Sequence, residues 1–251
     1  MILLLPNSVR SCTAAVPRLP RPMAFRAART AAVLLFCWPI CVPYSLGQSL
    51  DDFHGCPLEG KTKSKALRAL NRLKSRYNAP PAAHVNSKVT LQRVLERSKD
   101  KDTGEDTDED RWDEDDAAEV EGYVFDVKSG GLETCNCKKA SAERKDTHIE
   151  LVAAPSKNAK RQRFIVEVTP RVREIMAGKG FMWSTEALTK RIKHQWVRVR
   201  GWLLFDAEHW ANAQHTNPGG SKIWRATAWE IHPITRLEVK ERDRWVSLGG
   251  Q

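Results

Sequence analysis

The amino-acid sequence predicts a mainly β protein in which residues 120–241 form an OB-fold-like five-stranded barrel. Three observations support this fold class. Short segments with alternating apolar residues follow one another between turn signals. Their order is three strands, a helical stretch and two strands, as in an OB-fold. Gly122 and Gly201 stand inside strands at points where a closing barrel must bend. A five-stranded α+β sandwich would give the same order of elements.

Alternation and turn residues define each element of this domain. The strands carry apolar residues at every second position, so one face of each can turn toward a core. The first strand ends at a glycine pair and the third ends at Pro170, both of which interrupt strand pairing. The predicted strands are 120–131, 147–154, 163–170, 196–206 and 224–239, with helical stretches at 170–178 and 184–193 and a long polar loop at 207–221.

Residues 1–47 have the pattern of a secretory signal peptide. From Met23, basic residues precede a short apolar run at 31–42, and small residues follow before a cleavage point near Gln48. The first residues of the chain would then come from a misassigned upstream start codon. Because the apolar run is short for a membrane span, we expect no transmembrane segment in the mature protein. The alternative is an inner-membrane anchor formed by residues 30–47.

Residues 48–99 are predicted to be a basic helical segment. The stretch 57–78 repeats apolar residues at helical spacing among many lysines and arginines, and 87–99 can form a second short helix. Such a helix can pack one face on the domain and leave the rest solvated, or it can lie on a nucleic acid or an anionic membrane.

Two further segments are expected to lie outside the barrel. Residues 100–119 are almost all acidic or small, which predicts a disordered linker because such a composition buries too little apolar area to offset the entropy of ordering. Residues 242–251 are predicted to be a C-terminal tail.

Three cysteines follow the predicted signal peptide: Cys56, Cys135 and Cys137. Export would allow a disulfide. Cys56 paired with one of the other two is sterically easier than a bridge within "CNC", and one thiol is then left over. The spacing in "CNC" is too short for the usual zinc knuckle.

Several segments also carry a resemblance to other proteins. They are "EGYVFDVKSGGLETCNC", "DTHIELV", "VEVTPRVR", "VRGWLLFD" and "WEIHPITRLEV", preceded by "GCPLEG" and "ALNRLKSR". Residues from about 120 to 240 resemble a group of uncharacterised exported bacterial proteins with an OB-like domain. The resemblance implies export and an OB-like fold, and it implies no particular reaction.

Two strands carry a histidine and a glutamate two positions apart, so that both side chains point to the same face. Imidazole and carboxylate groups are ligands of zinc and manganese, which makes these pairs a candidate metal site, whereas a simple cross-strand ion pair is the structural alternative. No other cofactor is predicted. The candidate ligands are His148 and Glu150 on the second strand, Glu230 and His232 on the fifth, and His209 in the long loop.

A basic, tryptophan-containing face is the second candidate site. Arg198, Arg200 and Trp202 share the outer face of the fourth strand, and Arg225 opens the fifth. Guanidinium groups can hold phosphates while an indole ring stacks on a base, as in single-stranded nucleic acid binding. Residues 122–251 carry 23 Lys and Arg against 14 Asp and Glu, within a chain of net charge +10, and this excess favours an anionic partner.

These patterns favour an exported binding module over an enzyme, because no nucleophile elbow and no phosphate-cradling glycine loop is present. The predicted ligand is single-stranded nucleic acid or another polyanion. The alternatives are a metal-dependent phosphodiesterase or nuclease that uses the His/Glu pairs, and a periplasmic scaffold that binds only protein.

Overall fold

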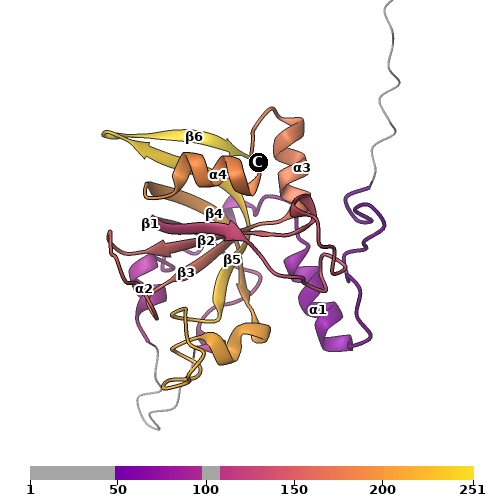
Figure 1. Cartoon of the computed structure of the whole chain (residues 1–251), viewed down its shortest axis with the longest axis horizontal. Helices are drawn as coiled ribbons and strands as arrows, with labels where there is room; N and C mark the ends of the chain where they lie inside the picture. The colour runs from indigo at the N-terminus through magenta and orange to yellow at the C-terminus, as the bar shows by residue number, and fades with distance from the viewer. Residues whose placement is uncertain (1–48, 98–107) are drawn as a thin grey trace, which may run out of the picture. The chain divides into compact units, whose positions relative to one another are not determined.

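Five strands close into a mixed β-barrel in the computed structural model, which describes residues 49–97 and 108–251 (Figure 1). The strand order is β3-β2-β1-β4-β5-β6, and a parallel pairing of β3 with β5 closes the first five strands. This strand order confirms the predicted OB-fold-like barrel. The strands are β1 Ala117–Ser129, β2 Thr147–Val152, β3 Phe164–Val168, β4 Trp196–Phe205, β5 Trp229–Glu241 and β6 Arg244–Gly250.

Bulges bend the long strands around the barrel. In β1 the register shifts between Val124 and Asp126, so the inward residues change from even to odd numbers along the strand. In β4 the shifts lie on both sides of Gly201. A Cβ atom on Gly201 would lie 2.1 Å from the carbonyl oxygen of Pro233. Only glycine therefore allows β4 and β5 to approach this closely at the bend.

The barrel interior is apolar. Trp229, Ile231 and Leu237 of β5 are fully buried in one core, as their shared face predicts. Burial of each such side chain contributes about 1.5–3 kcal/mol to stability, so this core holds the barrel closed. The inward side chains of the neighbouring strands complete it: Val120 and Val124 of β1, Ile149 and Leu151 of β2, Phe164, Val166 and Val168 of β3, and Val197, Val199 and Leu203 of β4.

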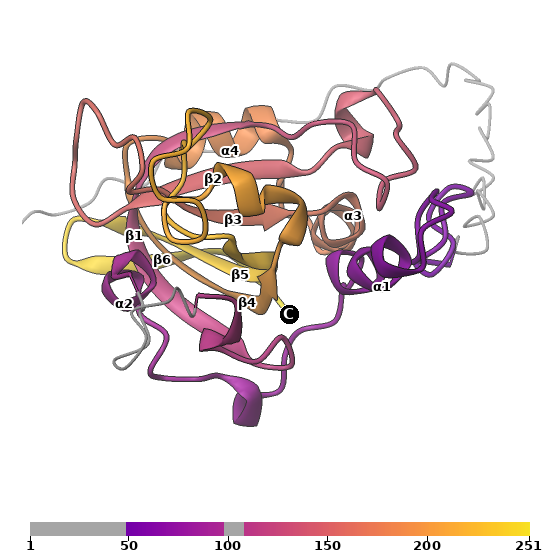
Figure 2. The ribbon, with the colours of Figure 1, turned by 90° about the horizontal axis from the view of Figure 1, so that it is seen from below.

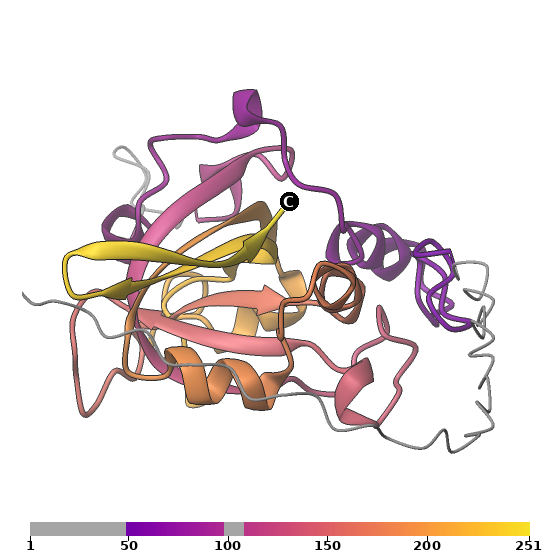
Figure 3. The ribbon, with the colours of Figure 1, turned by 90° about the horizontal axis from the view of Figure 1, so that it is seen from above.

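Capped helices cover the two ends of the barrel. The hydroxyl oxygens of Thr169 and Ser184 accept hydrogen bonds from the first turns of α3 and α4. Leu188 and Ile192 of α4 are buried in the core. Figures 2 and 3 show α2 at the opposite end of the sheet from α1 and α3. The helices are α1 Lys65–Lys74, α2 Leu91–Leu95, α3 Pro170–Gly178 and α4 Thr185–Ile192, with short 3-10 turns at Ala82–His84, Glu109–Arg111, Ala142–Arg144 and Ala207–Asn212.

Helix α1 is shorter than the predicted 57–78 and presents polar residues to the barrel. Asn71 and Lys74 are its buried side chains, whereas Leu70 and Leu73 are only half-buried. The apolar spacing therefore identified a helix but not the face by which it packs. No helix within residues 49–97 and 108–251 is long and apolar enough to cross a membrane.

Two predicted boundaries are wrong. Residues 108–119 belong to the folded domain: Asp108 is buried and accepts a hydrogen bond from the Trp229 indole through its carbonyl oxygen, and β1 already begins at Ala117. The composition of the acidic run hid these few ordered residues. The predicted tail 242–251 contains β6, which pairs with β5. Residues 100–107 of the predicted linker, residues 98–99 of the predicted helical segment and the predicted signal peptide lie outside the described residues.

Candidate metal centre on the β2–β3–β5 face

The outer face of β2, β3 and β5 carries a row of histidines and carboxylates. His148 of β2 pairs in register with Glu167 of β3, and Glu167 follows directly on the parallel pairing of Val166 with Ile231 of β5. This register places Glu167 between His148 and His232. One Glu167 carboxylate oxygen, Oε1, lies 2.9 Å from His148 Nε2, and the other, Oε2, lies 3.5 Å from His232 Nδ1.

The loop between β1 and β2 adds three more potential ligands. Glu133 and Cys135 stand two residues apart in this loop, and Asp146 ends it. The Asn136 side-chain amide donates to Asp146 Oδ2 at 2.6 Å, and the Gly130 amide donates to the Asp146 carbonyl oxygen at 2.8 Å. These bonds fix Asp146 next to the strand face.

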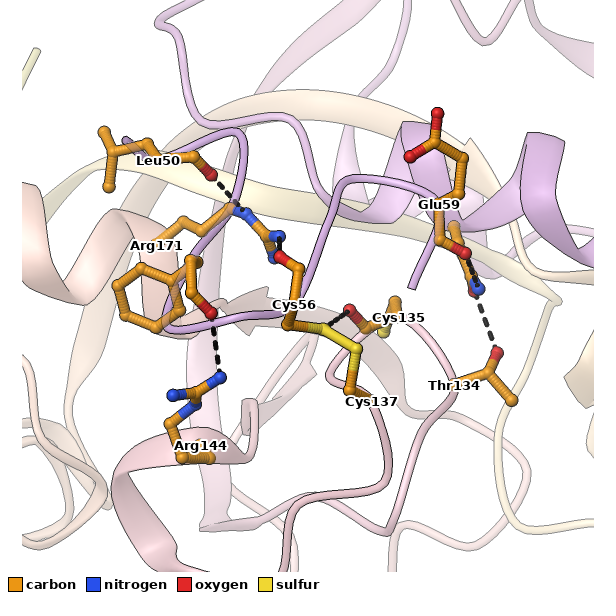
Figure 4. Close-up of a disulfide and its surroundings, with 10 residues drawn as sticks. Leu50, Cys56, Glu59, Thr134, Cys135, Cys137, Arg144 and Arg171 are labelled. Carbon is orange, nitrogen blue, oxygen red and sulfur yellow. Dashed lines mark hydrogen bonds between the residues drawn. A yellow bond between two sulfur atoms is a disulfide. The ribbon is translucent and has the colours of Figure 1, made fainter. Parts of the chain in front are cut away.

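A disulfide between Cys56 and Cys137 attaches the N-terminal segment to the same loop (Figure 4). The Arg171 guanidinium of α3 donates to the carbonyl oxygens of Leu50 and Cys56 at 2.8 and 2.7 Å. The Thr134 hydroxyl donates to Asn71 Oδ1 of α1 at 3.0 Å. The loop is therefore held from both sides, and its acidic side chains are fixed in position.

The potential ligand atoms converge. Single ligand atoms of Glu133, His148 and Glu167 all lie within 4.8 Å of one another, and the same holds for Asp146, Glu167 and His232. Glu167 belongs to both sets, so the two sets form one cluster. Nitrogen and oxygen atoms gathered in this way are the ligands that zinc and manganese take in proteins.

The cluster is buried and contains polar atoms without hydrogen-bond partners. Asp146, Glu167 and His232 are at most 2% exposed, and His148 is 7% exposed. Asp146 Oδ1 and His232 Nε2 lack a hydrogen-bond partner, whereas His148 Nε2 and Glu167 Oε2 have the ion-pair contacts given above. Buried polar atoms are nearly always hydrogen-bonded, and leaving one unpaired costs about 1–3 kcal/mol. Two such atoms in one buried cluster indicate that a bound ion can satisfy them.

Electrostatics explain the protonation of the two histidines. Burial alone would lower the pKa of His232, but Glu167 and Glu230 raise it to about 9. Burial likewise opposes protonation of His148, while Glu167 and Glu133 hold its pKa well above the ordinary value. Both imidazole rings are therefore protonated. A divalent ion bound in the cluster would supply the positive charge in place of these two protons.

The pKa values of the carboxyl groups in the cluster are also shifted by their charged neighbours. Burial, with the neighbouring Glu133 charge, raises the pKa of Asp146 to about 7. The pKa of Glu133 is lowered in spite of its burial, because Lys74 and His148 stabilise its charged form. Lys74 Nζ lies 3.0 Å from Glu133 Oε2 and 2.7 Å from Asp206 Oδ2.

A second ionic group adjoins the cluster through Glu230. Glu230 Oε1 accepts a hydrogen bond from Arg225 Nη1 at 2.5 Å, while its Oε2 lies 3.3 Å from His232 Nδ1. Arg225 is fully buried and also donates to the carbonyl oxygens of Thr227 and Trp229. The prediction that Arg225 contributes to an exposed ligand-binding face is therefore wrong.

The predicted metal ligands separate into three groups. His148 and His232 join the cluster through Glu167, and Glu230 touches it through His232. Glu150 turns away from it and forms ion pairs with Lys128 and Arg163. His209 lies in a neighbouring set with Asp206 and Glu230. Of the candidate ligands, Glu150 therefore follows the structural alternative, an ion pair, because Lys128 and Arg163 neutralise its carboxylate.

The basic face of β4 is neutralised by its neighbours. Arg198 donates to Glu121 Oε1 and also contacts Glu238, and Arg200 pairs with Glu119 at 2.8 Å. Trp202 is half-buried, donates its indole N–H to the Asn78 carbonyl oxygen and contacts the Arg76 guanidinium. The predicted alternation is present, but the arginines are already paired.

Sequence reasoning missed Glu133, Asp146, Glu167 and Lys74. A signal for two of them was present: Asp146 stands two positions before His148, and Glu167 is the one charged residue in an otherwise apolar strand. Both positions fall on the outward face by simple alternation. Glu133 and Lys74 lie on a loop and a helix, whose approach to the strands depends on tertiary structure.

Fold and site together define an OB-like barrel with a buried histidine–carboxylate centre beside its β1–β2 loop. The strands β2 and β3 and their flanking loops are the surface that OB-folds commonly use for ligands. Comparison with models of known protein families finds no match, and none of the curated proteins matches the sequence. The resemblance to exported bacterial proteins stays a prediction.

Proposed function

We propose that this protein is a binding module that holds a divalent metal ion, zinc or manganese, at the β2–β3–β5 face. The observation that carries the proposal is a buried cluster of converging ligand atoms in which Asp146 Oδ1 and His232 Nε2 have no hydrogen-bond partner. A purely structural ion-pair network would satisfy its own buried atoms. Imidazole and carboxylate ligands suit zinc and manganese, and a doubly positive ion would take the place of the two imidazole protons.

Burial favours binding over catalysis. A catalytic metal site keeps one coordination position open to water or substrate, whereas a structural site is closed. Here Asp146, Glu167 and His232 are almost inaccessible, and only Glu133 and His148 keep side-chain exposure, 15% and 9%. The alternative of a metal-dependent phosphodiesterase would need substrate to enter past these two residues. Hydrolysis of bis(4-nitrophenyl) phosphate by the metal-loaded protein, above that by the metal alone, would support this alternative.

The test of the proposal is metal binding by the full chain. After incubation with zinc or manganese and removal of excess ion, we expect one bound ion per chain, measured by inductively coupled plasma mass spectrometry. The double variant His148→Ala, His232→Ala should lose that ion, whereas His84→Ala, which changes an exposed histidine, should retain it. Thermal unfolding of each variant identifies loss of fold. Absence of bound ion in the wild type, or equal binding by the folded double variant, would overturn the proposal.

We also propose that the protein acts outside the cytoplasm, in the periplasm or extracellular space. The Cys56–Cys137 disulfide supports this location because structural disulfides persist mainly in oxidising compartments. The predicted signal peptide is consistent with it. Intact-mass measurement of the exported form should give an N-terminus near Gln48, and retention of Met23 in that form would contradict cleavage.

Polyanion binding through Arg198, Arg200 and Trp202 stays a prediction. The domain's excess of Lys and Arg supports it, but a phosphate would have to displace Glu119 and Glu121 from the two arginines. The structure favours neither single-stranded nucleic acid nor another polyanion as the ligand of this face. A protein-only scaffold is the outcome if neither binds at low salt.

A further inference from the structure

We propose that the Cys135 thiolate is a ligand of this metal centre, so that the centre takes a thiophilic divalent ion such as zinc in preference to manganese. The proposal rests on the metal centre proposed above and names the ion that it selects. Cys135 lies in the β1–β2 loop, next to the metal centre; the His/Glu pairs on β2 and β5 do not include this loop.

The geometry places Cys135 in the cluster. Its side chain is 3% exposed, and its Sγ lies 3.4 Å from Glu133 Oε2. One ligand atom each of Glu133, Cys135 and Asp146 lies within 4.8 Å of the other two. Asp146 Oδ1, which is fully buried, has no hydrogen-bond partner. A thiolate and two carboxylates, one of which has an unsatisfied buried oxygen, are a ligand set for a cation.

Glu133 connects this set with the histidines. Its Oε1 lies 3.8 Å from His148 Nε2, whereas its Oε2 points to Cys135 and Lys74. Asp146 also belongs to the set that contains Glu167 and His232. The thiol therefore borders the same centre as the two histidines.

The disulfide leaves Cys135 as a thiol. Cys137 is bonded to Cys56, and Cys135 is the free cysteine among residues 49–97 and 108–251. Figure 4 shows the Cys135 side chain beside the bridge, with its carbonyl oxygen 3.4 Å from Cys56 Sγ. Pairing of Cys137 elsewhere thus keeps the Cys135 sulfur available for a metal.

The surroundings distinguish a ligand from a packing residue. A free cysteine that packs as a small apolar side chain belongs among apolar neighbours, but the Cys135 sulfur contacts Glu133 and lies within 4.8 Å of an Asp146 oxygen. When the sulfur–metal bond forms, the thiol proton leaves to solvent and the thiolate takes its place. Thiolate ligands select zinc and related ions, whereas carboxylate and water ligands suit manganese and magnesium.

Cobalt substitution tests the inference separately from the metal centre itself. Cobalt(II) bound at low coordination number absorbs visible light through its d–d transitions, and a thiolate ligand adds a charge-transfer band in the near ultraviolet. The experiment uses the full chain with serine in place of Cys12, Cys37 and Cys41, so that Cys135 is the one cysteine outside the bridge. Alkylation of the denatured protein should count one free thiol.

We expect both bands in this background, and loss of the near-ultraviolet band alone in Cys135→Ser. Zinc affinity should fall in Cys135→Ser by at least about tenfold, since even loss of an outer-shell partner costs 10–100-fold, whereas manganese affinity should change little. Visible bands without the charge-transfer band would overturn the Cys135 assignment and leave the metal centre intact. No bands of either kind would overturn both. If Cys135→Ser fails to fold, the cobalt spectrum of the protein that retains Cys135 decides: the near-ultraviolet band supports the Cys135 assignment, and its absence overturns it.

Discussion

Lys74 Nζ lies 3.0 Å from Glu133 Oε2, although the two residues come from a helix and a loop that are 59 positions apart in the sequence. The lysine is 2% exposed and also contacts Asp206. Burial opposes its charge, but Glu133 and Asp206 hold its pKa well above the ordinary value. A cation supplied by α1 thus already balances part of the acidic cluster.

Removing that cation should destabilise the domain. In Lys74→Met, two buried carboxylates lose their partner, and breaking a buried ion pair in this way costs about 3–5 kcal/mol. Lys65→Met, which removes an exposed lysine from the same helix, should change the free energy of unfolding by less than about 0.5 kcal/mol. Urea denaturation of both variants measures the difference. Equal stability of the two would show that Lys74 does not balance the cluster.

The buried Arg225–Glu230 pair should show strong coupling. Arg225→Met leaves Glu230 buried with its Oε1 unpaired and should cost about 3–5 kcal/mol. The double variant Arg225→Met, Glu230→Gln should lose less than the sum of the two single variants, because no uncompensated charge remains. A double-mutant cycle by urea denaturation gives the coupling energy. Additive losses would mean that the two side chains act independently.

Reduction of the disulfide should weaken the attachment of residues 49–78. The Cys56–Cys137 bridge closes a long loop, with a sequence separation of 81, and loss of a native disulfide in a small domain typically costs about 2–5 kcal/mol. A reductant should therefore lower the unfolding midpoint of the wild type. The double variant Cys56→Ala, Cys137→Ala should start from the lower midpoint and respond no further. An unchanged wild-type midpoint would contradict a stabilising role.

The ion pairs of β4 give the polyanion prediction a sharper form. If Arg198 and Arg200 bind phosphates, then Glu119→Gln and Glu121→Gln should tighten binding of labelled single-stranded DNA, because they free the guanidinium groups. Arg198→Ala with Arg200→Ala should weaken binding and flatten its salt dependence. Fluorescence anisotropy at low and moderate salt measures both effects. Trp202→Ala should cost about 1–3 kcal/mol if a base stacks on the indole.

That test also has a clear negative result. Lack of binding at low salt, or the same affinity in the double arginine variant, would leave the Arg–Glu ladder of β1 and β4 with a purely structural role. Exposed pairs of this kind contribute about 0–1 kcal/mol each to stability.

The barrel could be predicted because its strands encode their own alternation. Trp229, Ile231 and Leu237 share a face by simple spacing, and the structure buries all three. Gly201 of β4 pairs with Ile234 of β5, and the register between the two strands shifts on both sides of this pair. The spacing of Ile231 and Leu237 alone could not show where this shift occurs. The additional strand β6 escaped prediction because it is short, directly follows the charged residues 241–243 and ends in two glycines.

The candidate centre could be predicted only in part. His148 and His232 followed from spacing on their strands, but Glu133 and Lys74 reach them through a loop and a helix that the sequence does not relate to the sheet. Arg225 is predicted at the surface from its place at the start of the fifth strand, although arginine can be fully buried where it is paired. Its partner, Glu230, was instead interpreted as a metal ligand, which hid the pairing.

Arg171 has a consequence for the order in which the protein matures. Its guanidinium grips the carbonyl oxygens of Leu50 and Cys56 from the first turn of α3, and these bonds need no oxidant. In the reduced protein, the same two bonds would hold the Cys56 thiol near the β1–β2 loop and so raise its local concentration there. Oxidation would then form the disulfide between two cysteines that the Arg171 hydrogen bonds already hold close together. The choice of cysteine partners would therefore not depend on the oxidant.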